Sequence, residues 1–331
     1  MLICKTPLRV SLFGGGTDHP SWFKNNNGYT ISLAIDKYCY VMFRRLPKVF
    51  KHNYRLRYFK NEHVKKISDI RHPSIKAALK KYMKSNAPIE IVHSSDIPGL
   101  SGLGSSSAFT VSLIKLITIF KKEKISKKDL VKKSIYFEQK ILKESVGCQD
   151  QYACAFGGFN FIKYRRKKIT LKKINITQKN KKKLIDNLIL VYSNIQRKSD
   201  KIEKDKLKNL KLNNNIMHKL NLNSLKGKKI LEAKSDISLL KIGNLLNENW
   251  NLKRKLSGYV SNSKIDKLYN FGMDNGAVGG KLLGAGGGGY ILFLTKNLNY
   301  QKKLIKKLKS RIYFKFNIDE MGSDIIYNSY E

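Results

Sequence analysis

The first part of the chain alternates between segments with a strand pattern and segments with a helix pattern. Residues 3–13 alternate between apolar and polar positions and run into a glycine triplet at 14–16, which predicts a strand followed by a sharp turn. Residues 28–45 are rich in β-branched and aromatic side chains and predict one or two long strands. A further short strand near residues 55–59 is expected to pair close by, and residues 73–85 predict a short amphipathic helix.

A strand, a glycine- and serine-rich loop and an apolar helix follow one another in the next segment. Residues 89–94 alternate as a strand, and residues 98–108 contain three glycines and three consecutive serines. Residues 109–120 carry apolar side chains three and four positions apart, which predicts a buried helix of about three turns. The first amides of such a helix have no internal partner and lie at the positive end of its dipole. This order therefore predicts a site for phosphate groups.

Two carboxylates stand out after this helix. Residues 126–142 begin with a capping box and predict a second helix, in which Glu138 lies among apolar neighbours and is a candidate metal ligand. Residues 144–158 place Asp150 between two glutamines and end in a glycine pair, which predicts a polar turn packed closely against backbone. The lysine-rich residues 163–184 predict two surface strands and a link.

The second half of the chain is predicted to be a separate domain. We place the division between residues 1–183 and 184–331, just before a buried strand. Residues 200–256 are expected to be largely helical, and mobility is expected in the Asn-rich stretch 213–223. The remaining predictions are strands at 188–192, 313–318 and 324–327, helices at 265–273 and 301–312, and a glycine loop that feeds a buried strand within 279–294.

The charge of the chain is unusual, with 66 Lys and Arg against 24 Asp and Glu and a net charge of +42. Such a charge raises the question of a nucleic-acid partner. However, Lys, Asn and Ile are abundant together, and the lysines are spread along the chain rather than gathered at one motif with aromatic residues. We therefore attribute the charge to composition and expect no specific nucleic-acid partner. A positive field would still attract anionic substrates such as ATP and sugar phosphates.

Cysteine usage and hydropathy indicate the compartment. Four scattered cysteines form no Cys-x-x-Cys pair, which favours reduced thiols in the cytosol over disulfides or a zinc site. No run of 18 apolar residues occurs, and the N-terminus has no long apolar stretch. The sequence therefore predicts a cytoplasmic protein with neither signal peptide nor membrane partner.

The glycine- and serine-rich segment fits neither the P-loop nor the dinucleotide-binding pattern, because no lysine follows Gly104 and the glycines are wrongly spaced. It resembles the second motif of the GHMP kinases, Pro-x3-Gly-Leu-Gly-Ser-Ser, which runs without a gap from Pro98 to Ser106. The resemblance implies that this segment binds ATP. The implied nucleotide-binding residues are Pro98, Gly99, Ser101, Gly102, Leu103, Gly104, Ser105, Ser106 and Ser107.

The first and third motifs of the same family are also present. Pro7, Arg9 and Thr17-Asp18 match the first motif, and residues 281–289 match the third, Lys-x-x-Gly-Ala-Gly-Gly-Gly-Gly. A glycine pair stands where galactokinase carries Glu-His, which argues against galactose and leaves room for a larger acceptor. The resemblance implies six substrate-binding residues, namely Gly15, Gly16, Thr17, Asp18, Gly286 and Gly287.

The resemblance also implies catalytic roles. Asp150 would be the base that accepts the proton of the attacking hydroxyl, and Arg9 would support the turn or offset charge on the transferred phosphoryl group. Ser106 and Glu138 would hold Mg²⁺. Ser107 occupies a position that is often alanine in the family, so which serine meets the metal is left open.

By family analogy the fold is α+β with two domains, an N-terminal domain like a ribosomal-protein domain and a C-terminal ferredoxin-like domain, with the active site between them. Within the family the sequence most resembles the heptose 7-phosphate kinases. The implied reaction transfers phosphate from ATP to the C1 hydroxyl of D-glycero-D-manno-heptose 7-phosphate, giving the 1,7-bisphosphate for nucleotide-activated heptose and surface polysaccharide. Three alternatives stay open: a kinase of an unphosphorylated, fucose-like hexose, a nucleic-acid-binding protein, and a degenerate relative that senses its ligand. Whether the chain forms a homodimer is also open.

Overall fold

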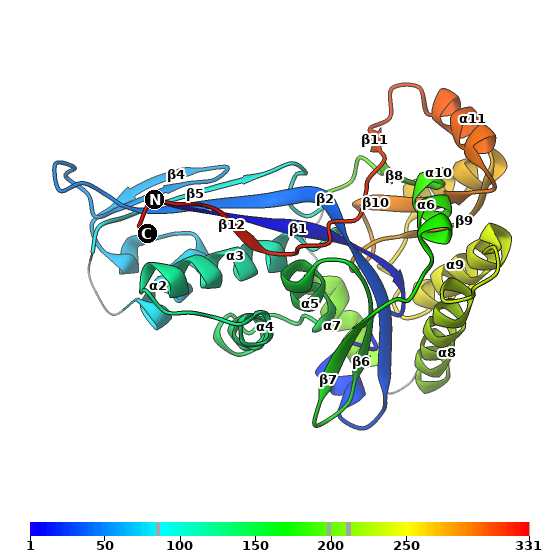
Figure 1. Cartoon of the computed structure of the whole chain (residues 1–331), viewed down its shortest axis with the longest axis horizontal. Coiled ribbons are helices and arrows are strands. Elements are labelled where there is room, and N and C mark those ends of the chain that lie inside the picture. Colours follow the sequence, from blue (N-terminus) through cyan, green and yellow to red (C-terminus); the bar gives the residue numbers. More distant parts are fainter. Residues whose placement is uncertain (84–86, 197–199, 210–212, 331) are drawn as a thin grey trace.

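Two β-sheets and the helices packed on them make up the described part of the chain (Figure 1). The computed structural model describes residues 1–83, 87–196, 200–209 and 213–330 of the 331. In these ranges no helix is both long and apolar enough to cross a membrane. The predicted α+β fold is confirmed, since helices and sheets are both present and neither alternates regularly with the other.

The first sheet has the strand order β12-β1-β2-β5-β3-β4, with β6 also paired to β2 and β7 paired to β6. Its strands are β1 (Leu2–Phe13), β2 (Gly28–Arg45), β3 (Tyr54–Arg57), β4 (Asn61–Val64), β5 (Ile89–Ser95), β6 (Phe159–Tyr164), β7 (Ile169–Lys173) and β12 (Asp324–Asn328). The segment predicted as one or two strands is the single strand β2. It pairs with β1 along most of its length and then with β5 at one end and β6 at the other.

Helices cover one face of this sheet (Figure 1). They are α2 (Pro73–Tyr82), α3 (Ser105–Phe120), α4 (Lys127–Tyr136) with its π-helical extension η2 (Phe137–Ile141), and α5 (Gln149–Phe156). There are also two short helical segments in the described part of this half. The segment α1 (Pro20–Phe23) lies between β1 and β2, and η1 (Ile67–Asp69) lies between β4 and α2. Helix α3 starts four residues before the apolar pattern does, so the three serines form its first turn.

The prediction of a polar turn at residues 144–158 is wrong over most of that segment, because residues 149–156 form the helix α5. Its small side chains Ala153, Cys154 and Ala155 are buried and pack against β1 and α3. Small side chains allow this close approach, and the helix provides hydrogen-bond partners for the buried backbone N–H and C=O groups. The end of the segment 163–184, predicted as two strands and a link, instead forms most of helix α6 (Gln178–Asp186), capped by Thr177.

The second sheet contains β8 (Leu188–Tyr192), β9 (Ala277–Leu282), β10 (Tyr290–Thr295) and β11 (Tyr313–Phe314), in the order β11-β8-β10-β9 with every pair antiparallel. Alternation along β8 and β10 divides the side chains between two cores. Leu188 and Leu190 belong to the large core shared with the first sheet, whereas Ile189 and Val191 belong to a second core that contains Trp250. Because successive residues of a strand face opposite sides, one face of this sheet joins the two halves.

The other helices of the second half are α7 (Asp200–Asn209), α8 (Asn214–Leu231), α9 (Leu239–Arg254), α10 (Ser263–Asp274) and α11 (Leu298–Leu308). The largely helical prediction for residues 200–256 is confirmed: α8 and α9 are separated by the non-helical residues 232–238, and residues 210–212 lie outside the described residues. Most of the Asn-rich stretch belongs to α8, where Asn221 and Asn223 are buried. Residues 277–282, assigned in part to a glycine loop, form strand β9 instead.

The predicted division at residue 183 falls inside helix α6. The last strand, β12, returns to the first sheet and pairs with β1, which brings the two ends of the chain together (Figure 1). A division into two domains therefore has to assign β12 to the first of them. The boundary itself stays a prediction.

Candidate active site

A pocket lies where the glycine loops of the two halves meet. Its walls come from the turn after β1, the loop before α3, the start of α5, helices α7 and α9, and the loop between β9 and β10. The lining residues are Arg9, Ser11, Gly15, Gly16, Asp18, His19, Leu100, Gly102, Gly104, Ser105, Ser106, Ser107, Val146, Gly147, Gln149, Asp150, Gln151, Glu203, Lys253, Lys281, Leu283, Gly284, Ala285 and Gly288.

One wall of the pocket is the N-terminus of α3. Its N-cap, Gly104, is left-handed (φ 77°) and has no side chain to cap the helix. The amides of the first turn therefore remain available, and the positive end of the helix dipole faces the pocket. Ser105 and Ser106 line the pocket beside these amides, and Ser106 is exposed. This arrangement can bind the phosphate groups of a nucleotide.

The loop between β9 and β10 supports this wall through backbone contact. A Cβ atom on Gly284 would lie 2.6 Å from the Cα of Gly102, and one on Gly102 would lie 2.8 Å from the carbonyl oxygen of Leu283. Tyr290 also donates its backbone N–H to the carbonyl of Ser101. The third glycine motif is thus needed to let the second sheet approach the phosphate loop.

We expect the Gly284→Ala substitution to destabilise the protein and to weaken ATP binding. The backbone at Gly284 is left-handed (φ 66°) and the added carbon would overlap Gly102, so the strain should be about 1–3 kcal/mol. Denaturant unfolding and nucleotide titration measure the two effects. Gly258→Ala is the matched control, because a Cβ there meets nothing within 4 Å. Equal behaviour of the two variants would contradict this account of the loop contact.

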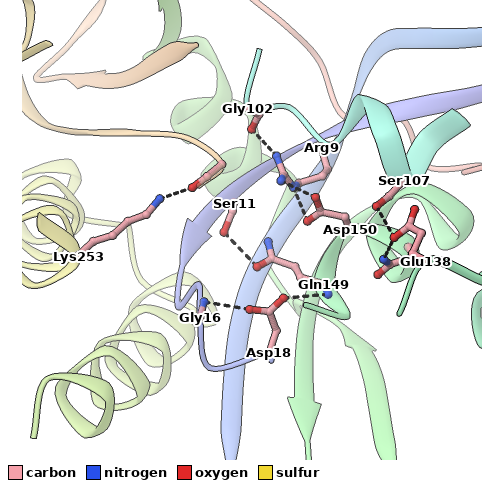
Figure 2. A network of polar contacts seen from close by, with 12 residues as sticks. Arg9, Ser11, Gly16, Asp18, Gly102, Ser107, Glu138, Gln149, Asp150 and Lys253 are labelled. Atoms are coloured by element: carbon pink, nitrogen blue, oxygen red, sulfur yellow. Dashed lines mark hydrogen bonds and ion pairs between the residues drawn. The ribbon is translucent and has the colours of Figure 1, made fainter. Parts of the chain in front are cut away.

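Arg9 and Asp150 form a two-pronged ion pair in the centre of the site (Figure 2). Arg9 Nε donates to Asp150 Oδ1 at 2.8 Å, Nη2 donates to Oδ2 at 2.6 Å, and Nη1 donates to the Gly102 carbonyl at 2.6 Å. Burial alone would lower the pKa of Arg9, but the charge and hydrogen bonds of Asp150 raise it. The arginine thus fixes the side chain of Asp150 against the phosphate loop. The Asp150 side chain keeps 26% exposure, so a substrate can reach it.

Asp18 is held beside Asp150 by backbone amides (Figure 2). Its Oδ1 accepts from Gly16 N at 3.0 Å and its Oδ2 from Gln149 N at 3.1 Å. Burial, and then the charge of Asp150, raise the pKa of Asp18, while the bond from Gln149 opposes the rise. Gly147 leaves the space for this carboxylate, because a Cβ there would lie 1.9 Å from Oδ2. Asp18 can therefore accept hydrogen bonds from a polyhydroxy acceptor at the edge of the pocket.

Glu138 lies behind the first turn of α3 and is fully buried. Its Oε2 accepts from Ser107 Oγ at 3.1 Å and from Gln151 Nε2, whereas its Oε1 has no hydrogen-bond partner (Figure 2). Burial raises the pKa of Glu138 to about 8. Leaving a buried carboxyl oxygen unpaired is unfavourable, and such an exception calls for an explanation. A metal ion next to Glu138 would provide one.

The residues near Glu138 fit Mg²⁺ rather than a metal held by protein alone. Within the described part of the chain, no group of three or more His, Cys, Asp and Glu side chains could hold a metal ion. Mg²⁺ commonly takes one or two carboxylates together with substrate phosphates and water. Glu138 supplies one carboxylate, close to the phosphate-binding helix. Ser107 contacts Glu138, whereas the predicted ligand Ser106 is exposed and lines the pocket.

The structure does not bring every predicted residue to the pocket. Thr17 was predicted to bind the sugar, but it is buried and its hydroxyl donates to the Tyr29 carbonyl at 3.0 Å. Gly286 and Gly287 pack against Val260 and are not among the lining residues of this pocket; Gly284, Ala285 and Gly288 of the same loop are. The other predicted residues outside the lining set are Pro98, Gly99, Ser101 and Leu103, which belong to the phosphate loop, and Glu138, which is fully buried.

Several lining residues were missed by the sequence analysis. The two glutamines beside Asp150 were noticed only as its neighbours, yet Gln149 accepts from Ser11 Oγ at 3.2 Å and Gln151 donates to Glu138. Lys281 opens the third motif, so its motif position was a usable signal. Lys253 carries no such signal, because it is one of 66 basic residues in a lysine-rich chain. Glu203 was also missed as a lining residue.

Comparisons with known proteins agree with this geometry. The family model described as GHMP kinases N terminal domain matches residues 73–158, and GHMP kinases C terminal matches residues 231–313. The chain is 30% identical over 317 residues to D-glycero-alpha-D-manno-heptose 7-phosphate kinase of Campylobacter jejuni, covering 92% of this chain and 93% of the relative. It is 23% identical to the bifunctional fucokinase/GDP-fucose pyrophosphorylase of Arabidopsis thaliana, over 93% of this chain but only 31% of that protein.

A solved structure supports the fold. The crystal structure of a D-glycero-D-manno-heptose 1-phosphate kinase from Bacteroides thetaiotaomicron superposes with a TM-score of 0.80. The alignment covers 99% of this chain and 100% of that chain at 21% sequence identity. At this identity the likeness establishes the fold.

Proposed function

This chain belongs to the GHMP kinase family and is an ATP-dependent sugar kinase, and we propose that its acceptor is D-glycero-D-manno-heptose 7-phosphate. The reaction would transfer the γ-phosphoryl group of ATP to the C1 hydroxyl and release ADP and the 1,7-bisphosphate, a precursor for nucleotide-activated heptose. The main support for catalysis is the position of the Asp150 carboxylate, which Arg9 holds in the same pocket as the N-terminus of α3.

The residues on the page suffice for phosphoryl transfer, which depends mainly on positioning and charge stabilisation. The free amides of α3 and the hydroxyls of Ser105 and Ser106 would hold the phosphates of ATP. Asp150 would accept the proton of the attacking hydroxyl, and Arg9 would keep its carboxylate oriented. Glu138 and Ser107 would contribute to the binding of Mg²⁺, which when bound neutralises charge on the phosphates.

The acceptor follows from the relative rather than from the geometry. The Campylobacter relative is named for heptose 7-phosphate, whereas the name of the Arabidopsis relative includes fucokinase activity, so a free, fucose-like hexose is the second candidate. The room left by Gly15 and Gly16 at the edge of the pocket favours the larger acceptor. Cytosolic placement, Mg²⁺ dependence and the absence of a nucleic-acid partner stay predictions, and the homodimer stays open.

We expect ATP- and Mg²⁺-dependent release of ADP with heptose 7-phosphate as acceptor, and little or none with free sugars. The measurement is a coupled ADP assay over a panel of heptose 7-phosphate, sedoheptulose 7-phosphate, mannose, fucose, galactose and mevalonate. Turnover confined to heptose 7-phosphate supports the proposal. Preferred turnover of a free hexose keeps the family and replaces the acceptor, and silence across the panel with ATP still bound would overturn the proposal.

A further inference from the structure

Two buried lysines, one on β9 and one on α9, line the pocket. Lys281 belongs to β9 itself, is 2% exposed, and donates from Nζ to the carbonyl of Leu12 at 3.1 Å. Lys253 comes from α9, is 5% exposed, and donates to the carbonyls of Leu282 at 3.4 Å and Gly284. Nothing in the proposed transfer of the γ-phosphoryl group uses these two ammonium groups.

The carbonyl partners hold the ammonium groups in fixed positions. Helix α9 packs closely on β9, so both lysines are anchored on the same rigid pair of elements. Burying a charged lysine is costly, and a protein with many exposed lysines has no need to bury two at one pocket for solubility. An ordered ammonium loses little further freedom when it binds an anion. The pair is therefore suited to a phosphate group.

Lys253 lies away from the predicted metal ligand Glu138, although the carbonyl of Gly284 that it binds belongs to the loop packed against Gly102. In Figure 2, Lys253 lies on one side of the Arg9–Asp150 pair, and Ser107 and Glu138 lie on the other. If the γ-phosphoryl group sits at the start of α3 and the attacking hydroxyl at Asp150, the phosphates of ATP extend over the Ser107 side. The acceptor then extends past Asp150 toward the lysines.

Two carboxylates in the pocket are unfavourable neighbours for an acceptor phosphate. Asp18 and Glu203 also line the pocket, and their carboxylates would repel a phosphate group placed against them. Lys281 reaches the end of β1, which leads into the turn of Gly15 and Gly16. A sugar bound at Asp18 and this turn would thus present its far end to Lys253 and Lys281.

We propose that Lys253 and Lys281 bind a phosphate group carried by the acceptor at the end remote from the reacting hydroxyl. The pair would then determine the preference for a sugar phosphate over a free sugar. This inference rests on the proposed function, because it needs an acceptor with its own phosphate. It makes no use of the metal, and it assigns to these residues binding and selectivity rather than chemistry.

The test uses the variants Lys253→Met and Lys281→Met, and the matched control is Lys255→Met at the exposed C-cap of α9. The readouts are kcat/KM for heptose 7-phosphate, kcat/KM for the same heptose without its phosphate, and KM for ATP. Losing one charge-assisted hydrogen bond should lower kcat/KM for the phosphorylated acceptor about 10- to 100-fold. The value for the free heptose, the KM for ATP and all values of the control should stay close to wild type.

Every other outcome overturns either the proposed function or the inference about the two lysines. An equal loss on both acceptors would show a structural role for the lysines, and a raised KM for ATP would place them at the nucleotide. If the wild type phosphorylates no sugar, the proposed function fails. If it prefers heptose 7-phosphate and the variants keep that preference, only the inference about the lysines fails.

A measurement on the wild-type enzyme keeps the inference testable if the variants do not fold. Inorganic phosphate should inhibit competitively against heptose 7-phosphate and not against ATP, because it would occupy the lysine pair. Inhibition that competes with ATP alone would overturn the inference. The variant Lys253→Arg, which keeps the charge, should retain the preference for the phosphorylated acceptor better than Lys253→Met.

Discussion

Replacing Asp150 by Asn is expected to reduce kcat by about 10²–10⁴-fold while ATP still binds. The substitution keeps the size and one acceptor oxygen but removes the group that takes the proton of the attacking hydroxyl. Arg9 retains its hydrogen bond to the Gly102 carbonyl, so the phosphate loop keeps one of its supports. Steady-state kinetics give kcat, and nucleotide titration shows that the binding of ATP survives.

The matched control is Glu90→Gln. Glu90 is also a buried carboxylate paired with arginine, since it is 2% exposed and accepts from Arg44 and Arg55 in the first sheet. It does not line the pocket. Both variants should lower the free energy of unfolding, because each leaves arginine without its charged partner. Only Asp150→Asn should lower kcat, and near wild-type turnover in that variant would remove Asp150 as the base.

Replacing Glu138 by Gln is expected to lower turnover by about 10²–10³-fold at limiting Mg²⁺, because a bound cation contributes several kcal/mol of charge stabilisation. The amide preserves the shape of the side chain but carries no charge for the metal. Titration of activity with MgCl2 should show a weaker apparent affinity in the variant. Chelation with EDTA should abolish turnover of the wild-type enzyme.

The pH dependence of metal binding separates this role from a structural one. Burial raises the pKa of Glu138 to about 8, so the metal-free carboxyl is mainly protonated below that pH. Mg²⁺ binds the ionised form, and its apparent affinity should therefore increase as pH rises toward 8. The Gln variant should lack this dependence. An identical pH profile in both proteins would exclude Glu138 as a metal ligand.

The glycine- and serine-rich loop could be predicted from sequence because its structure is local. Glycine at a left-handed position and an apolar pattern behind it define a loop followed by a helix, whatever the rest of the chain does. The apolar pattern begins four residues after the actual start of α3. Serines give no apolar signal and have a weak helix preference, but the packed helix extends through all three of them. The motifs also identified the family, which the comparisons confirm.

Helix α5 could not be predicted from its local sequence. Its residues form a helix because the helix is buried against β1 and α3, contacts that the segment cannot make alone. The glutamines beside Asp150 have no recognisable role until that helix turns one toward Ser11 and the other toward Glu138. Thr17 illustrates the reverse, because its motif position suggested sugar binding and the fold uses its hydroxyl to hold Tyr29.

The sequence by itself determined the family, the phosphate-binding loop and the carboxylates Asp18, Glu138 and Asp150, because those signals depend on residue type and short spacing. Only the tertiary structure decided which groups meet. Arg9 and Asp150 are 141 residues apart in sequence, and they pair because β1 and α5 pack together. The assignment of Lys253 to the pocket has the same origin, since only the packing of α9 on β9 distinguishes it from the other lysines of the chain.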